Sequence, residues 1–303
     1  MDCADLGPYH LEKGKVMAAF NRAAERYEDE AVLQRTVAQS MVERLALVKI
    51  NPVWILDVGA GTGTGARLLA KRYRGARIIQ LDIAWHMLRV GKRYAPRFFS
   101  RQHFVQGDAE ILPIPSRSVD MVYANLILQW CNNLDQVFGE FRRVLRPSGL
   151  LMFTTFGPDT LKELRESWRA SDECIHVSAF VDMHDIGDGL IRAGLAEPVM
   201  DVEYFTLTYA DVYRLMRELK TLGSHNVATG RRHSLTGKGR LKRMIDAYEA
   251  HRQGHSIPAT HEVIYGHAWA PAPGHEPNEA PPGVATFPIA ELKRRRTGRP
   301  ERR

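Results

Sequence analysis

One stretch constrains this chain more than any other. The apolar run Ile55–Val58 leads directly into a turn with glycine at Gly59, Gly61 and Gly63. The short apolar run predicts a buried strand. Glycine tolerates positive φ angles and lets a ligand approach the backbone closely, so the turn predicts a ligand site. Because Ala66–Tyr73 then has helical spacing, the unit is strand, glycine turn and helix, which is typical of α/β proteins that bind ligands at this edge.

The strand pattern recurs along the chain and predicts the fold. Further apolar runs alternate with segments of helical spacing, which favours a parallel, doubly wound sheet. Helical spacing over residues 16–48 predicts two helices before the first strand. Two late helical segments, at 211–222 and 240–252, stand between two predicted strands and suggest a lid. The other predicted elements are strands at 76–82, 104–108, 119–125, 150–156, 199–208 and 262–269, and helices at 134–145 and 185–193.

The predicted fold is therefore an α/β, doubly wound, Rossmann-like sheet with N-terminal helices and a helical lid inserted before the last strand. Its parts are a helical cap at 1–50, a cofactor-binding core at 51–208, the lid at 209–256, the final core strand at 257–270, and a proline-rich, basic tail at 271–303 that we expect to be disordered.

Composition excludes several classes of protein. No run of about 18 uncharged apolar residues is present, so we expect no membrane span. Three cysteines are too few and too scattered for a disulfide framework or a zinc site, and we predict no metal. A net charge of +7 is too modest for a dedicated DNA-binding protein. We expect a cytoplasmic monomer without a nucleic-acid partner.

Acidic residues at successive strand ends identify the ligand. The glycine turn alone would also suit a dinucleotide, but Asp57, Asp82 and Asp108 place three carboxylates along the same sheet edge. Asp82 can accept hydrogen bonds from both ribose hydroxyls, and Asp108 can accept one from an adenine amino group. So many carboxylates would repel a pyrophosphate but not a cationic nucleoside. S-adenosylmethionine combines ribose, adenine and a sulfonium without phosphate, and is the predicted cofactor.

These residues resemble a known family. Leu56–Gly63, Leu81–Ile83 with Met87-Leu88, and Gly107–Ala109 look like the successive motifs of class I S-adenosylmethionine-dependent methyltransferases. The resemblance implies a role for each matching residue. Gly59, Ala60 and Gly61 would border the methionyl part, Asp57 would organise its amino group, and Asn125 and Leu126 would offer backbone near it. Asp82 would bind the ribose, Ile83 and Met87 would pack on the adenine, and Asp108 and the Ala109 amide would bind its polar edge.

A narrower resemblance covers most of residues 13–270. Phe20–Tyr27 with Leu33–Arg35, then Asn125–Cys131, then Leu219–Asn226 look like the malonyl-acyl carrier protein O-methyltransferases of biotin synthesis. Such an enzyme esterifies the free carboxylate of a malonyl thioester, which fatty-acid elongation then accepts as a primer for pimeloyl synthesis. Where that family often has Gly-Ala, this chain has Gly223-Ser224. The implied partner is acyl carrier protein carrying malonyl-phosphopantetheine.

The implied reaction suits a site without a general base. A carboxylate has a pKa near ~4 and is already ionised at neutral pH, so attack on the methyl needs positioning and desolvation. We assign no catalytic base. Tyr27, Gln129 and Trp130 are the candidates near the methyl group, and Arg214 or Arg217 from the lid is the candidate that holds the malonyl carboxylate.

A basic stretch suggests where the carrier docks. Residues 231–243 contain six Lys/Arg and no acid, and a basic rim beside a lid would steer a strongly acidic carrier protein. The same stretch could simply be a solvated face. The candidate docking residues are Arg231, Arg232, Lys238, Arg240, Lys242 and Arg243.

Two alternatives remain open. The first is a methyltransferase that uses the same cofactor on another small acid or a quinone precursor. The second is a cofactor-binding assembly factor or a hydroxylase built on the same fold, which would form a stable protein complex without methylating a carrier.

Overall fold

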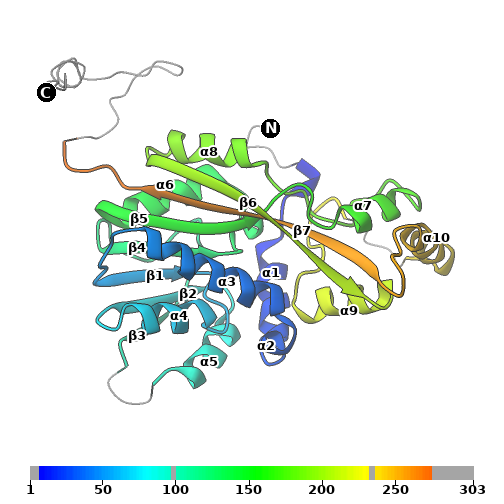
Figure 1. Cartoon of the computed structure of the whole chain (residues 1–303), viewed down its shortest axis with the longest axis horizontal. Helices are drawn as coiled ribbons and strands as arrows, with labels where there is room; N and C mark the ends of the chain where they lie inside the picture. The colour runs from blue at the N-terminus through cyan, green and yellow to red at the C-terminus, as the bar shows by residue number, and fades with distance from the viewer. Residues whose placement is uncertain (1–6, 97–99, 232–235, 275–303) are drawn as a thin grey trace, which may run out of the picture.

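The described residues form one sheet of seven strands, in the order β3-β2-β1-β4-β5-β7-β6 (Figure 1). The computed structural model describes residues 7–96, 100–231 and 236–274. The predicted tail therefore lies outside the described residues from residue 275 onward. The strands are β1 (Trp54–Val58), β2 (Arg77–Asp82), β3 (Gln102–Gln106), β4 (Val119–Asn125), β5 (Leu145–Phe156), β6 (Ala196–Tyr209) and β7 (Ile257–Trp269).

Strand direction confirms the predicted α/β architecture and corrects one detail. β1 to β5 are parallel, as the alternation of strands and helices predicts. β7 differs, because it pairs antiparallel with both β5 and β6. An antiparallel pair needs no crossover helix on the sheet. The segment that joins β6 to β7 is therefore free to form helices at the end of the pair.

Helices cover both faces of the sheet. Neighbouring residues of β1 point to opposite faces: Ile55 joins one apolar cluster and Leu56 joins the other. The cluster of Ile55 includes residues of α3 (Val32–Arg44) and α4 (Thr64–Arg72), and the cluster of Leu56 includes residues of α6 (Leu134–Val144) and α8 (Met183–Arg192).

The N-terminal helices reach the ligand edge of the sheet. α1 (Lys13–Ala23) packs on α5 (Trp85–Tyr94), with Ala23, Met87 and the partly buried Phe20 in one small cluster. The sequence predicts two helices here, and the structure has three, because the four-residue α2 (Tyr27–Glu30) stands between α1 and α3. Short 3₁₀ helices occupy Gly7–Tyr9, Leu45–Leu47 and Leu128–Trp130.

A second group of helices gathers where β6 ends and β7 begins (Figure 1). α7 (Lys162–Arg169), α9 (Val212–Thr221) and α10 (Lys238–Glu249) form their own apolar cluster there. α7 is absent from the prediction. It contributes Leu164 and Trp168, which pack with Met244 and Tyr248 of α10. Within the described ranges, no helix is both long and apolar enough to cross a membrane.

Candidate functional site

The glycine turn after β1 adopts a backbone that only glycine accommodates without strain. Gly59 and Gly61 have φ angles of 69° and 55°. At Gly59 a Cβ atom would also lie 2.6 Å from Cγ1 of Ile127. The turn is tied to the neighbouring strand, because the Gly59 amide donates a hydrogen bond of 2.8 Å to the carbonyl oxygen of Leu81. The turn therefore presents its backbone at the ligand edge.

Asp82 lies at the end of β2 and faces this turn. Its Oδ2 accepts a hydrogen bond of 2.9 Å from the Gly61 amide, and its Oδ1 accepts one of 2.8 Å from the Ala84 amide. Burial raises the pKa of Asp82 to about 6, although the two amides favour the charged form. A carboxylate offers about four acceptor sites, so Asp82 keeps capacity for the hydroxyls of a ribose.

Asp57 lies deeper than its predicted role implies. Only 2% of it is exposed, and it is not among the residues that line the cavity beside the turn. Its carboxylate accepts a hydrogen bond from the backbone of Ala66 in α4, and its Oδ2 is buried without a hydrogen-bond partner in the described part of the chain. Burial, helped by the charge of Asp82, raises the pKa of Asp57 to about 7. Ala60, also predicted at the cofactor, is buried and likewise not among the lining residues.

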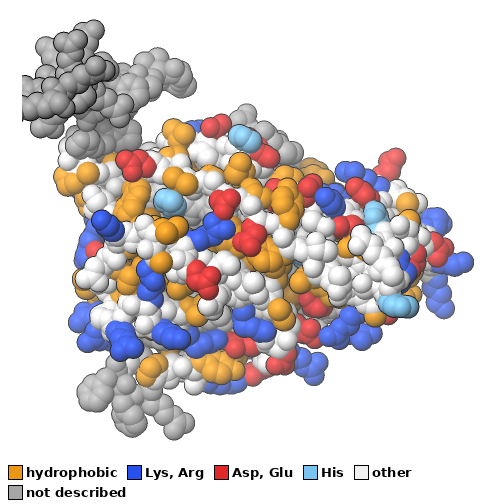
Figure 2. Space-filling view, viewed as in Figure 1, with side chains coloured by type: hydrophobic (Ala, Val, Ile, Leu, Met, Phe, Trp, Pro, Cys, Tyr) orange, Lys and Arg blue, Asp and Glu red, His pale blue; other side chains and the backbone are white. Residues whose placement is uncertain are grey.

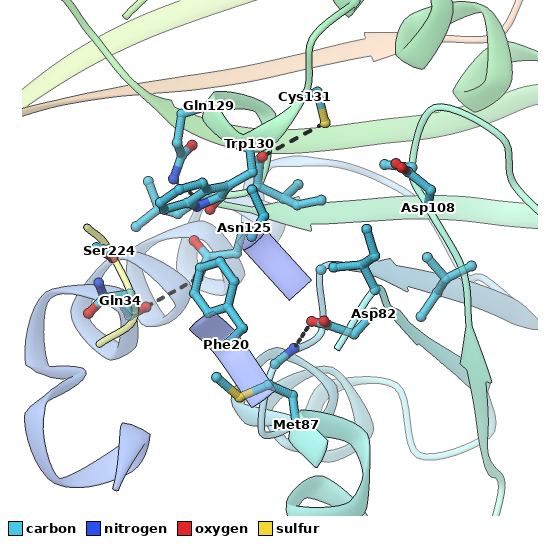
Figure 3. Close-up of a pocket in the computed structure, with 18 of the residues that line it drawn as sticks. Phe20, Gln34, Asp82, Met87, Asp108, Asn125, Gln129, Trp130, Cys131 and Ser224 are labelled. Atoms are coloured by element: carbon cyan, nitrogen blue, oxygen red, sulfur yellow. Dashed lines mark hydrogen bonds between the residues drawn. The ribbon is translucent and has the colours of Figure 1, made fainter. Parts of the chain in front are cut away.

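A cavity lies beside the turn and brings most of the predicted residues together (Figure 3). In this view Asp82 and Asp108 stand on one side and Gln34 and Ser224 on the opposite side. The predicted residues that line it are Gly59, Gly61, Asp82, Ile83, Met87, Asp108, Ala109, Asn125, Leu126, Tyr27, Gln129 and Trp130. The lining residues that the sequence analysis missed are Lys13, Val16, Phe20, Gln34, Leu81, Gly107, Ile127, Cys131, Phe156 and Ser224.

Helix α1 covers one side of the cavity. Lys13 Nζ lies 3.0 Å from Oδ1 of Asp108 and 3.0 Å from Oε1 of Glu110. The ring of Phe20 meets the ring of Trp130 edge-on, with centroids 5.1 Å apart. The carboxylate predicted for the adenine is therefore fixed by a cation that is distant in sequence, and an aromatic pair stands at the end where the methyl group is predicted.

An uncharged polar network lines the other end of the cavity. Asn125 donates a hydrogen bond of 3.2 Å to the backbone oxygen of Gln34, and Gln129 donates one of 2.7 Å to that of Leu126. Leu126 has a φ of 51°, and its amide bonds to Thr154. The side-chain Oε1 of Gln34 is buried and has no hydrogen-bond partner among the described residues. This end can therefore hold a polar group of a ligand without adding a charge.

A second, larger cavity of about 800 Å³ lies next to the first and shares part of its lining. Its size is within the range of small-molecule sites. Arg217 of α9 lines it, whereas Arg214 of the same helix does not and instead lies 3.6 Å from Glu30. Five residues line both cavities: Gln34, Gln129, Trp130, Phe156 and Ser224.

Comparison with known proteins identifies the family. The methyltransferase domain family matches residues 56–153. Malonyl-[acyl-carrier protein] O-methyltransferase of Methylovorus sp. is 51% identical over 270 residues, which cover 87% of this chain and 90% of that protein. The chain belongs to the malonyl-[acyl-carrier protein] O-methyltransferase family. Malonyl-[acyl-carrier protein] O-methyltransferase 1 of Coxiella burnetii, another relative, is 38% identical over 291 residues, which cover 95% of this chain and 98% of that one.

Solved structures support the fold. The YcgJ protein from Bacillus subtilis matches with a TM-score of 0.55 at 17% identity, covering 77% of this chain and 98% of that one. A methyltransferase from Bacillus halodurans matches equally well. At this identity the likeness concerns the fold alone. Together with the family, it confirms the prediction of an enzyme that transfers a methyl group from S-adenosylmethionine.

Four of the residues predicted to dock a carrier, Lys238, Arg240, Lys242 and Arg243, lie on α10, and Arg231 lies before that helix. Arg231 forms an ion pair of 2.7 Å with Glu12, and Arg240 lies 3.8 Å from Asp172. Arg232 lies outside the described residues. Lys238, Lys242 and Arg243 are exposed on α10, and Figure 2 shows Lys and Arg side chains at the end of the molecule that carries α10 in Figure 1.

The burial of Asp57 makes the stability of the protein depend on pH. Its folded pKa of about 7 lies above the ordinary value of 3.8, so folding takes up a proton between these values. The protein therefore loses stability as the pH rises through this window. Between pH 5 and 7 we expect the free energy of unfolding to fall by about 2 kcal/mol more in the wild type than in Asp57→Asn. Urea unfolding of both proteins at the two pH values measures this difference, and parallel pH profiles would contradict it.

Proposed function

We propose that this enzyme transfers a methyl group from S-adenosylmethionine to the free carboxylate of malonyl-acyl carrier protein, producing the malonyl methyl ester and S-adenosylhomocysteine. One observation carries the proposal: a cavity lined by the glycine turn and Asp82 joins a larger cavity through uncharged polar and aromatic side chains. The first suits the cofactor and the second suits an acyl chain on its carrier arm. The ester would then prime pimeloyl synthesis for biotin.

The residues at the junction suit carboxylate methylation. A carboxylate oxygen forms a bond to the methyl carbon, the C–S bond breaks, and its electron pair stays on sulfur. The acceptor loses no proton, so the site needs alignment and exclusion of water. Gln34 and Gln129 offer neutral hydrogen-bond donors, and Trp130 supplies an apolar wall. Burial raises the pKa of Tyr27, so its hydroxyl stays protonated and can donate a hydrogen bond.

The test is an assay with methyl-labelled cofactor and purified malonyl-acyl carrier protein. We expect a methyl ester on the carrier that mild base removes. Acetyl-acyl carrier protein is the matched control, since it lacks the free carboxylate and should take no label. Labelling of free malonate or a quinone precursor instead of the carrier would favour the other methyltransferase. A stable complex with the carrier and no label would favour an assembly factor.

A further inference from the structure

Four cations line the second cavity. Arg22 and Arg26 come from α1 and the turn that follows it, and Arg217 and Lys220 come from α9. Among the described residues that line this cavity, Glu218 is the one acid, and its Oε1 accepts a hydrogen bond of 2.9 Å from the hydroxyl of Tyr209. The lining is therefore strongly positive.

These four cations differ from neighbouring ones because, in the described part of the chain, none of them forms an ion pair with a carboxylate. Arg214 pairs with Glu30, and Arg231 pairs with Glu12. His225, which also lines the cavity, reports the positive surroundings: its pKa is lowered by burial and by the charges of Arg22, Lys220 and Arg231. Like charges gathered over a cavity repel each other, and an anion bound among them would relieve that repulsion.

The position of the cations excludes the reacting carboxylate as that anion. None of the four lines the first cavity, and the residues that line both cavities are uncharged. In the proposed function, a carboxylate at the methyl group would contact Gln34, Gln129 or Trp130, whereas the four cations line only the second cavity. The lining of the second cavity also includes apolar side chains such as Leu161 and Met216.

We propose that Arg22, Arg26, Arg217 and Lys220 bind the phosphate of the pantetheine arm that presents the acyl group. This inference rests on the proposed function and replaces the predicted role of Arg217 at the malonyl carboxylate. A phosphate accepts charge-assisted hydrogen bonds from several cations at once. The apolar stretch of the cavity would hold the pantetheine, and the malonyl end would reach the junction.

Three substrates separate the phosphate from the rest of the carrier: malonyl-acyl carrier protein, malonyl-phosphopantetheine and malonyl-pantetheine, which lacks the phosphate. For Arg22→Ala and for Arg217→Ala we expect KM to rise about tenfold with the first two substrates, from the loss of one charged hydrogen bond. With malonyl-pantetheine, kcat/KM should change less than twofold. Arg214→Ala is the matched control, because it removes a cation of the same helix that pairs with Glu30 outside the cavity. It should leave all three substrates unaffected.

Any other pattern of kinetic effects across the three substrates contradicts the proposal. An equal loss of kcat/KM with all three substrates would mean that the cations bind the malonyl carboxylate or only stabilise the fold. A loss of kcat/KM confined to malonyl-acyl carrier protein would mean that the cations contact the acidic surface of the carrier. No loss with any substrate would mean that the cations do not contact the substrate. If the wild-type enzyme methylated none of the three, the proposed function would fail first and the inference with it.

Discussion

Asp82→Ala should lower the affinity for S-adenosylhomocysteine about 100-fold. Asp82 lines the first cavity, which is the proposed cofactor site, and its two carboxylate oxygens accept hydrogen bonds from the amides of Gly61 and Ala84. Hydrogen bonds to a charged group contribute about 1.5–3 kcal/mol each, and a ribose would make two of them. The substitution also releases the turn amide that Asp82 positions. Titration calorimetry with the wild-type protein and with Asp82→Ala measures the change in affinity directly.

Asp188→Ala provides the comparison. Asp188 is an exposed carboxylate of α8 and does not line the cavity, so its loss should leave the affinity within twofold of the wild type. Both variants must show the same cooperative unfolding as the wild type before the affinities are compared. If folded Asp82→Ala bound S-adenosylhomocysteine as tightly as the wild type, Asp82 would not be a ribose-binding residue.

Local patterns were sufficient to predict the sheet. The strand predicted at 119–125 coincides with β4, and Asp82 ends β2 as expected. Each buried strand carries its own apolar run, so its prediction needs no partner. α7 was not predicted, although Leu164 and Trp168 have the i, i+4 spacing of an amphipathic helix, and the α10 residues that bury them come about 80 positions later. The antiparallel β7 likewise depends on pairing that no local pattern records.

The cavity-lining residues at the strand ends were predictable for the same reason, whereas those contributed by α1 were not. Asp82 and Asp108 follow strands whose ends must meet at one edge. Lys13 reaches Asp108 only because α1 folds over that edge, 95 residues away in sequence. The one signal for Gln34 is its place in the segment Leu33–Arg35, which carries the family resemblance.

Helix α9, part of the predicted lid, shows why a residue type alone does not identify a substrate contact. Arg214 and Arg217 were equivalent candidates, because both are cations on one predicted helix. In the structure Arg217 lines the large cavity, whereas Arg214 faces Glu30 of α2. Which side of α9 meets the cavity depends on how the N-terminal helices pack against it. Tertiary contacts, rather than the sequence of the helix, therefore determine which face of α9 lines the cavity.

Gly59→Ala should destabilise the protein by about 3 kcal/mol, whereas Gly61→Ala should cost about 1 kcal/mol. Both glycines have positive φ angles, so alanine is strained at either position. Only at Gly59 would the new Cβ also collide with a neighbour, 2.6 Å from Cγ1 of Ile127. At Gly61 the nearest atom to a new Cβ is Cε1 of Tyr27, at an ordinary contact distance of 4.0 Å.

Urea unfolding of the two variants separates backbone strain from collision, because the two changes differ mainly in the presence of Ile127. Ile127 itself lines the first cavity, the proposed cofactor site, so displacing it should also weaken binding of S-adenosylhomocysteine in Gly59→Ala. Equal destabilisation of the two variants would mean that Ile127 moves aside at no cost. The close fit of the turn against Ile127 would then not be what requires glycine at position 59, and the positive φ angle alone would explain it.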